Sequence, residues 1–133
     1  MLKHYINICR LDNISKHIFI LPGIFLAILY NQHYEISIFN ITFGFICAII
    51  SASANYVINE YVDIKFDKFH PIKNKKILLK KKISKKNVIC FYLSLVLISI
   101  ILSYRINIYF FYTNILFLVS GIIYNLKPLR LKD

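Results

Sequence analysis

Residues 54–76 read ANYVINEYVDIKFDKFHPIKNKK, and this stretch decides the fold that the sequence predicts. An uncharged apolar run leads into it, and a lysine-rich segment follows it. In a helix, positions four apart lie about 40° from one another around the axis, so they share one face. Four polar residues have this spacing, and we call them the polar stripe: Asn55, Asn59, Asp63 and Asp67.

The last three members of the polar stripe suit a hard cation. Mg²⁺ takes a few protein oxygens and leaves coordination positions for phosphate. Asn59, Asp63 and Asp67 are therefore candidate metal ligands and candidate catalytic residues. The ordinary alternative is a solvated helix end whose aspartates pair with Lys65 and Lys68, and the spacing alone is compatible with both. Acidic groups at the end of a long uncharged run, however, tend to be functional.

The composition indicates a membrane protein. The chain has 133 residues and is 58% hydrophobic, yet its formal net charge is +11. A soluble domain of this size could hardly bury so much apolar surface, whereas long uncharged runs between clusters of charge are typical of membrane spans. The three cysteines form no CxxC pair, so we interpret them as small buried thiols rather than as a zinc site or a disulfide framework.

We predict an all-α, polytopic transmembrane bundle that forms a single membrane domain over residues 1–133. Its four spans lie near residues 14–34, 36–60, 87–104 and 106–126, and a basic loop occupies residues 65–86. With the amino terminus in the cytoplasm, every basic residue except Arg105 lies on the cytoplasmic side, as the positive-inside rule requires. We expect an integral protein of the bacterial inner (plasma) membrane with both termini cytoplasmic.

The basic residues that follow the polar stripe have two interpretations. Lys73 and Lys76 lie just beyond His70-Pro71, close enough in sequence to clamp phosphates as point charges. The lysines of the loop could instead orient the chain and bind anionic lipid head groups. Basic runs also bind nucleic acid. Here the loop joins two predicted spans, so membrane orientation accounts for its charge and we expect no nucleic-acid partner.

The sequence over residues 51–76 resembles the first aspartate-rich motif of the UbiA superfamily of intramembrane prenyltransferases. The family pattern is Asn-Asp-x-x-Asp-x-x-x-Asp. This chain matches it at Asn59, Asp63 and Asp67 and has Glu60 in place of the first aspartate. The resemblance covers the residues that spacing alone singles out.

Further motifs resemble one branch of this superfamily, the polyprenyl-phosphate phosphoribosyltransferases. His70-Pro71-x-Lys73 is similar to their His-Pro-x-Lys-x-x-Arg-Pro, although Lys76 replaces the arginine and Ile77 the proline. The segment that leads into the first predicted span is similar to Arg-Pro-x-Gln-Trp-x-Lys-Asn at four positions, and the exit from the fourth is loosely similar to Tyr-Ser-x-x-x-Lys at residues 124–127. The four positions are Arg10, Asn13, Lys16 and His17.

The resemblance implies an all-helical membrane transferase whose cavity opens to the cytoplasm. It implies that Asn59, Asp63 and Asp67 hold a Mg²⁺-diphosphate. The diphosphate-binding side chains that it implies are Lys73, Lys76, Lys16 and Arg10. The expected partners are a polyprenyl lipid substrate, a diphosphate donor and membrane lipids. One branch transfers a prenyl group, and the other passes phosphoribose to polyprenyl phosphate.

Members of the superfamily are longer and carry a second aspartate-rich motif. We therefore expect an incomplete chain whose carboxy-terminal half belongs to a longer reading frame or is supplied in trans. Two alternatives stay open at this point. The chain could be an inactive or partner membrane fragment, or a non-enzymatic membrane protein with a lipid-binding lysine loop.

Overall fold

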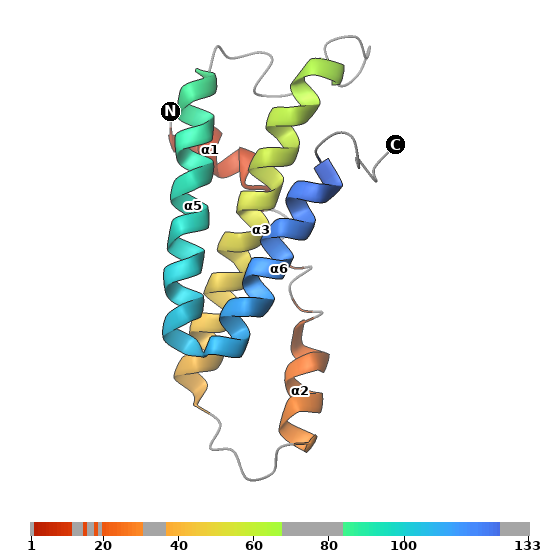
Figure 1. The fold of residues 1–133 in the computed structure, drawn as a ribbon, viewed down its shortest axis with the longest axis vertical. Coiled ribbons are helices and arrows are strands. Elements are labelled where there is room, and N and C mark those ends of the chain that lie inside the picture. The colour runs from red at the N-terminus through yellow and green to blue at the C-terminus, as the bar shows by residue number, and fades with distance from the viewer. Residues whose placement is uncertain are drawn as a thin grey trace.

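The computed structural model describes residues 2–11, 15, 18, 20–30, 37–67 and 84–125, with the backbone alone at residues 2–4, 27 and 64–67. These residues form a helical bundle without any strand in the ranges described, which confirms the predicted all-α fold. In Figure 1 the long helices lie side by side, and the short ones lie at their margin. The helices are α1 (Leu2–Ile8), α2 (Leu21–Tyr30), α3 (Ile38–Asp67), α5 (Lys85–Ile106) and α6 (Ile108–Asn125).

The uncharged run that precedes the polar stripe forms most of α3, the longest of these helices. α3 has 30 residues without a proline, and it contains the whole polar stripe. Small side chains occupy residues 51–54 near its middle, where they let other helices approach closely. α3 contacts both α5 and α6 there, so it forms the centre of the bundle.

Asn107 joins α5 to α6. Its own backbone is extended, with φ of −168° and ψ of 148°, which ends α5. Its side-chain oxygen accepts a 2.7 Å hydrogen bond from the backbone N–H of Tyr109. This contact satisfies one of the free N–H groups at the start of α6. A single residue therefore turns the chain back on itself, and α5 and α6 form an antiparallel pair.

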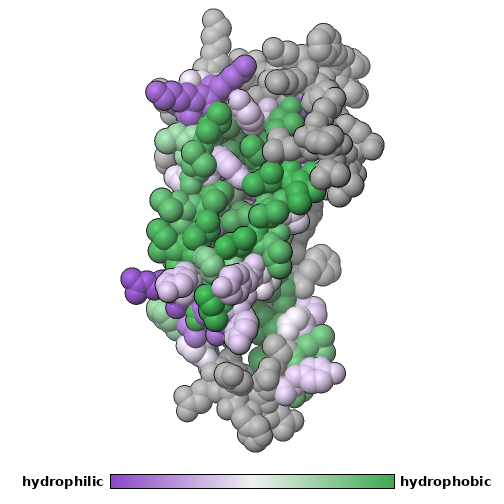
Figure 2. Space-filling view, viewed as in Figure 1, coloured by the Kyte–Doolittle hydropathy of each residue, from purple (hydrophilic) through white to green (hydrophobic). Residues whose placement is uncertain are grey.

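Within the described ranges, three helices are long and apolar enough to cross a membrane. They are α3 (to Asp63), α5 and α6, while α2 is a shorter apolar helix. These three overlap the last three predicted spans, and α2 lies within the first, near residues 14–34. Figure 2 shows a hydrophobic band over the face of the bundle, with hydrophilic residues toward both ends. The number and the bounds of the spans stay predictions.

The amino-terminal segment is anchored on the bundle by a small apolar cluster. Ile8 and Cys9, at the end of α1, are buried together with Val57 of α3 and Val88 of α5. In Figure 1 α1 lies toward the end of the bundle where α3 ends and α5 begins. The cluster therefore holds the amino-terminal segment close to the polar stripe.

Candidate functional site

The polar stripe occupies the last turns of α3. Asp63 is buried, with 7% of its surface exposed, and Asn55 and Asn59 are partly buried. Asp67 is the last residue of α3, so its backbone continues the helical spacing, while its side chain is outside the described part. The structure thus places Asn59 and Asp63 one turn apart on one helix face, as the sequence predicts.

A groove of about 440 Å³ lies between α3 and α6 beside the polar stripe, and we call it the α3–α6 groove. Both Asn55 and Asn59 line it from α3. Hydroxyl and amide groups line the opposite side, on α6. The α3 side consists of Ala52, Asn55, Tyr56 and Asn59, and the α6 side of Phe117, Ser120, Gly121, Tyr124 and Asn125. A mostly apolar groove that carries a few hydroxyl and amide groups is the usual form of a ligand site.

The two walls of the groove meet closely at Asn55 and Gly121. The Asn55 side chain donates a 3.3 Å hydrogen bond from Nδ2 to the backbone oxygen of Phe117. A side chain on Gly121 would overlap the Asn55 amide, so glycine is required for this approach. Lower in the same interface, Ser51 and Asn114 join the helices through a 2.6 Å side-chain hydrogen bond.

Asn114 also ties α6 to α5. Its Nδ2 atom lies 3.3 Å from the Ser99 backbone oxygen and 3.3 Å from the Ser103 hydroxyl. We call Ser51, Ser99, Ser103 and Asn114 the serine–asparagine cluster, and all four are buried. Hydrogen bonds between helices fix their relative positions in a membrane bundle. The cluster therefore positions the walls of the α3–α6 groove.

Arg10 reaches α3 from the amino-terminal segment, at residues next in sequence to members of the polar stripe. Its Nη2 atom lies 3.7 Å from the carboxylate of Glu60, which is largely buried, and its guanidinium lies 5.7 Å from the centre of the Tyr56 ring. Its backbone has a φ of 50°, in the left-handed region that non-glycine residues rarely adopt. This turn follows α1 directly and brings the cation to α3, where Tyr56 also lines the α3–α6 groove.

The sequence-predicted site is only partly within the described residues. Lys16, Lys73 and Lys76 lie outside them, as does the side chain of Asp67. Among the side chains that the structure describes, no three His, Cys, Asp or Glu residues come together as a metal site. Asn59 and Asp63 nevertheless fit Mg²⁺ by their chemistry, because both offer oxygen, the ligand that this ion prefers.

Sequence reasoning missed two parts of the site. It singled out Arg10 for phosphate binding but gave no sign that Glu60 pairs with it across the bundle. It also missed the α6 wall, where Ser120 and Asn125 face residues on α3. The polar residues of α6, spaced within an otherwise apolar run, were the available signal. Their partners are distant in sequence, so only the folded chain identifies them.

Comparison with known proteins gives one match. The model of the UbiA prenyltransferase family matches residues 20–133, which include the polar stripe and all of α3, α5 and α6. The chain therefore belongs to the UbiA prenyltransferase family, and it is an integral membrane protein of the prenyltransferase type. No curated protein and no solved structure matches it.

Proposed function

We propose that this member of the UbiA prenyltransferase family transfers a group from a diphosphate donor that is bound with Mg²⁺ at the end of α3. The observation that carries the proposal is the burial of Asp63. This residue is 7% exposed near the end of an apolar helix, one turn from Asn59 in the α3–α6 groove. A carboxylate buried inside a protein is costly unless it is paired or binds a metal, so its position favours a functional role.

The roles of the residues follow from their chemistry. Asn59, Asp63 and Asp67 hold Mg²⁺ through oxygen atoms. Mg²⁺ held there would supply positive charge next to the departing diphosphate. Arg10, Lys16, Lys73 and Lys76 donate hydrogen bonds to phosphate oxygens. Arg10 can do so with two parallel N–H groups, which also orients the donor, whereas each lysine acts as a point charge.

We further propose that the donor is phosphoribosyl diphosphate and that the acceptor is polyprenyl phosphate. The bond between ribose C1 and the diphosphate oxygen breaks, and the diphosphate leaves with the bonding electrons. An anionic oxygen of the polyprenyl phosphate forms the new bond to C1. With a prenyl diphosphate as the donor, the same kinds of bond break and form, and its allylic carbon takes the place of ribose C1. The acceptor's polyprenyl chain suits the exposed apolar face of α6.

The proposed reaction takes place on the cytoplasmic side of a bacterial plasma membrane, with both termini on that side. The end of α3, the start of α5 and the end of α6 lie at one end of the bundle in Figure 1. This arrangement supports one shared face for the polar stripe and for the basic segments that follow these helix ends.

The proposal includes further helices that cover the α3–α6 groove, as a continuation of the chain or in trans. Phe117 and Tyr124 line the groove and are 46% and 45% exposed, so they offer apolar surface to such neighbours. The DNA that follows codon 133, read in all three frames, is the direct check. Further apolar spans with a second aspartate-rich motif support this part, and unrelated sequence removes the continuation.

The experiment that tests the proposal is binding of inorganic diphosphate to the full chain in lipid nanodiscs, by calorimetry with and without Mg²⁺. We expect Mg²⁺-dependent binding that Asp63→Asn weakens at least tenfold, because one charge-bearing metal ligand is lost. Asp67→Asn is expected to behave in the same way.

The matched control is Glu35→Gln, which removes a carboxylate that the positive-inside assignment puts on the opposite face. This variant should bind as the unaltered chain does. Diphosphate binding that needs no Mg²⁺ and survives the loss of both aspartates would contradict the proposal. That result would favour the lipid-binding lysine loop instead.

A further inference from the structure

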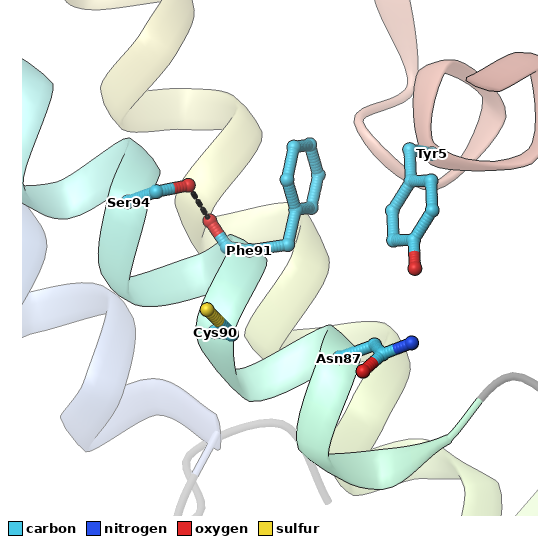
Figure 3. A pocket seen from close by; sticks show the side chains of 5 residues that line it. All are labelled: Tyr5, Asn87, Cys90, Phe91 and Ser94. Carbon is cyan, nitrogen blue, oxygen red and sulfur yellow. Dashed lines mark hydrogen bonds between the residues drawn. The ribbon is translucent and has the colours of Figure 1, made fainter.

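A second groove, away from the polar stripe, lies between α1 and α5. Its volume is about 380 Å³, and we call it the α1–α5 groove. Figure 3 shows Tyr5 of α1 beside Phe91 of α5, and the two rings meet edge to face with centres 5.0 Å apart. The remaining lining side chains all come from the first turns of α5: Asn87, Cys90 and Ser94.

The interior of the α1–α5 groove is apolar although it contains a serine. The hydroxyl of Ser94 donates a 2.7 Å hydrogen bond to the backbone oxygen of Phe91, so its polarity is satisfied within the helix (Figure 3). Cys90 offers a thiol, which packs as a small apolar group. The two rings form one wall, and Asn87 is the polar residue nearest the start of α5. This lining suits a hydrocarbon chain that carries a polar group at one end.

The groove continues into an exposed apolar face along α5. Leu97 and Ile101 follow Ser94 at helical spacing, and they are 60% and 52% exposed. From Asn87 to Ile101 the helix rises about 21 Å, at roughly 1.5 Å per residue. That distance exceeds half of a hydrocarbon core of about 30 Å. An acyl chain of one leaflet can therefore lie in the groove and continue along this face.

Positive charge gathers at the polar end of the groove. Lys85 and Lys86 are exposed in the first turn of α5, directly before Asn87. The amino end of a helix adds partial positive charge at the same place. In the sequence, residues 68–132 include no Asp or Glu, so this charge has no acidic neighbour along the chain. The complementary ligand is anionic at its head and apolar in its tail.

We propose that the α1–α5 groove binds one anionic phospholipid of the surrounding membrane, with its phosphate at Lys85 and Lys86 and one acyl chain against Phe91. The site is separate from the α3–α6 groove and uses none of the residues assigned to the transfer reaction. It would anchor α1 to α5 through a lipid, on the side of the bundle that these two helices form.

Cys90 offers a direct readout, because it lines the groove and is exposed, whereas Cys9 and Cys47 are buried. The full chain is placed in nanodiscs of phosphatidylglycerol or of phosphatidylcholine with the same acyl chains. Labelling of Cys90 by N-ethylmaleimide is then followed by mass spectrometry. We expect labelling to be roughly fivefold slower in phosphatidylglycerol, where the bound lipid covers the thiol.

Two variants separate the site from the general effect of an anionic surface. Lys85→Gln/Lys86→Gln should lose the protection and label faster in phosphatidylglycerol, since each lysine near a membrane surface is worth roughly a fivefold change in anionic-lipid affinity. Loss of the two lysine cations would by itself slow the labelling of the nearby Cys90 thiol. Faster labelling in this variant therefore indicates that the bound lipid has been lost. Arg105→Gln, at the opposite end of α5, should keep the full protection.

Equal labelling rates in the two lipids would overturn the proposal. The proposal would also fail if the unaltered chain and both variants showed the same difference between the lipids, because that difference would reflect surface potential alone. No labelling of Cys90 in either lipid would also overturn it, because the groove would then be closed. Native mass spectrometry of the purified chain supplies an independent result. A retained phospholipid supports the assignment, and a retained polyprenyl phosphate at Cys90 would replace it.

Discussion

The hydroxyl of Ser51 on α3 donates a 2.6 Å hydrogen bond to the side-chain oxygen of Asn114 on α6, and both residues are buried. The same Asn114 side chain donates to α5, so one amide holds three helices together. The Cys47 backbone oxygen, 2.9 Å from the Ser51 hydroxyl within the same helix, is a second acceptor within reach of its single proton. The serine therefore keeps a partner when the asparagine is removed, and the asparagine is the more informative residue to change.

Asn114→Leu is expected to destabilise the bundle by about 1–2 kcal/mol, because the contacts between helices are lost while the serines stay paired within their helices. Unfolding in mixed detergent micelles measures this change. Thr113→Val is the control, since Thr113 is exposed and bonds only to its own helix at Tyr109 in the contacts described. An equal loss of stability in both variants would mean that the cluster does not join the helices.

Gly121→Ala is expected to separate α3 from α6 at the groove. The added methyl group would overlap the Asn55 amide, at a cost of roughly 1–3 kcal/mol. Gly23→Ala is the control, because nothing lies near a side chain placed there. The double variant Asn55→Ala/Gly121→Ala should recover part of the lost stability, since the obstructing amide is gone. If the double variant recovers no stability, the close approach of Asn55 is not the reason that position 121 requires glycine.

The cysteines should react in a fixed order. Cys90 is exposed, Cys9 is 7% exposed and Cys47 is fully buried. Burial raises the pKa of the Cys9 thiol above its ordinary value, and a contact with Ser53 offsets this in part. N-ethylmaleimide should therefore label Cys90 first and Cys9 later, with the labelling of Cys9 shifted to higher pH. Cys47 should react only on unfolding.

The raised pKa of Cys9 also has a stability consequence with a definite sign. The folded chain keeps this proton at pH values where the unfolded chain has lost it. The contribution to stability is therefore complete below the ordinary thiol pKa of 9.0 and is lost as pH rises through the raised value. Cys9→Ser should flatten this alkaline decline in unfolding experiments, and an unchanged decline would assign it to other groups.

Glu60→Gln is expected to loosen the amino-terminal segment slightly. The Arg10–Glu60 pair is partly exposed on the arginine side, so its loss should cost at most about 1 kcal/mol. Labelling of Cys9, which lies beside Arg10, should become up to roughly fivefold faster, while Cys47 stays protected. Val57→Ala disturbs the apolar cluster under Cys9 and should have a larger effect. The reverse order would make the ion pair the principal anchor.

The all-α fold could be predicted from the sequence because uncharged runs and helix spacing are local signals. The polar stripe needed only the period of α3, so Asn59 and Asp63 were found without any contact. Asn107 was not foreseen as the joint between α5 and α6, because one asparagine in an apolar region has many possible roles. Its extended backbone and its cap on Tyr109 are visible only in the folded chain.

Contacts between distant residues could not be predicted in the same way. Arg10 and Glu60 are separated by fifty positions, and α1 brings them together only because Ile8 and Cys9 are buried against two other helices. The spacing of the serines in α5 does not identify Asn114 of α6 as their partner. Local patterns therefore gave one wall of the site, and packing of the helices supplied the other.

The length of α3 exceeds the thickness of the hydrocarbon core of a membrane. Its 30 residues span about 45 Å, whereas a hydrocarbon core is about 30 Å thick and takes roughly 20 residues. A helix that enters the core at Ile38 leaves it near Val57, so the segment from Asn59 to Asp67 extends into the head-group layer. A lipid-soluble reactant in the hydrocarbon core and a water-soluble reactant at the head groups can then meet along one helix. Neither reactant has to leave its own phase.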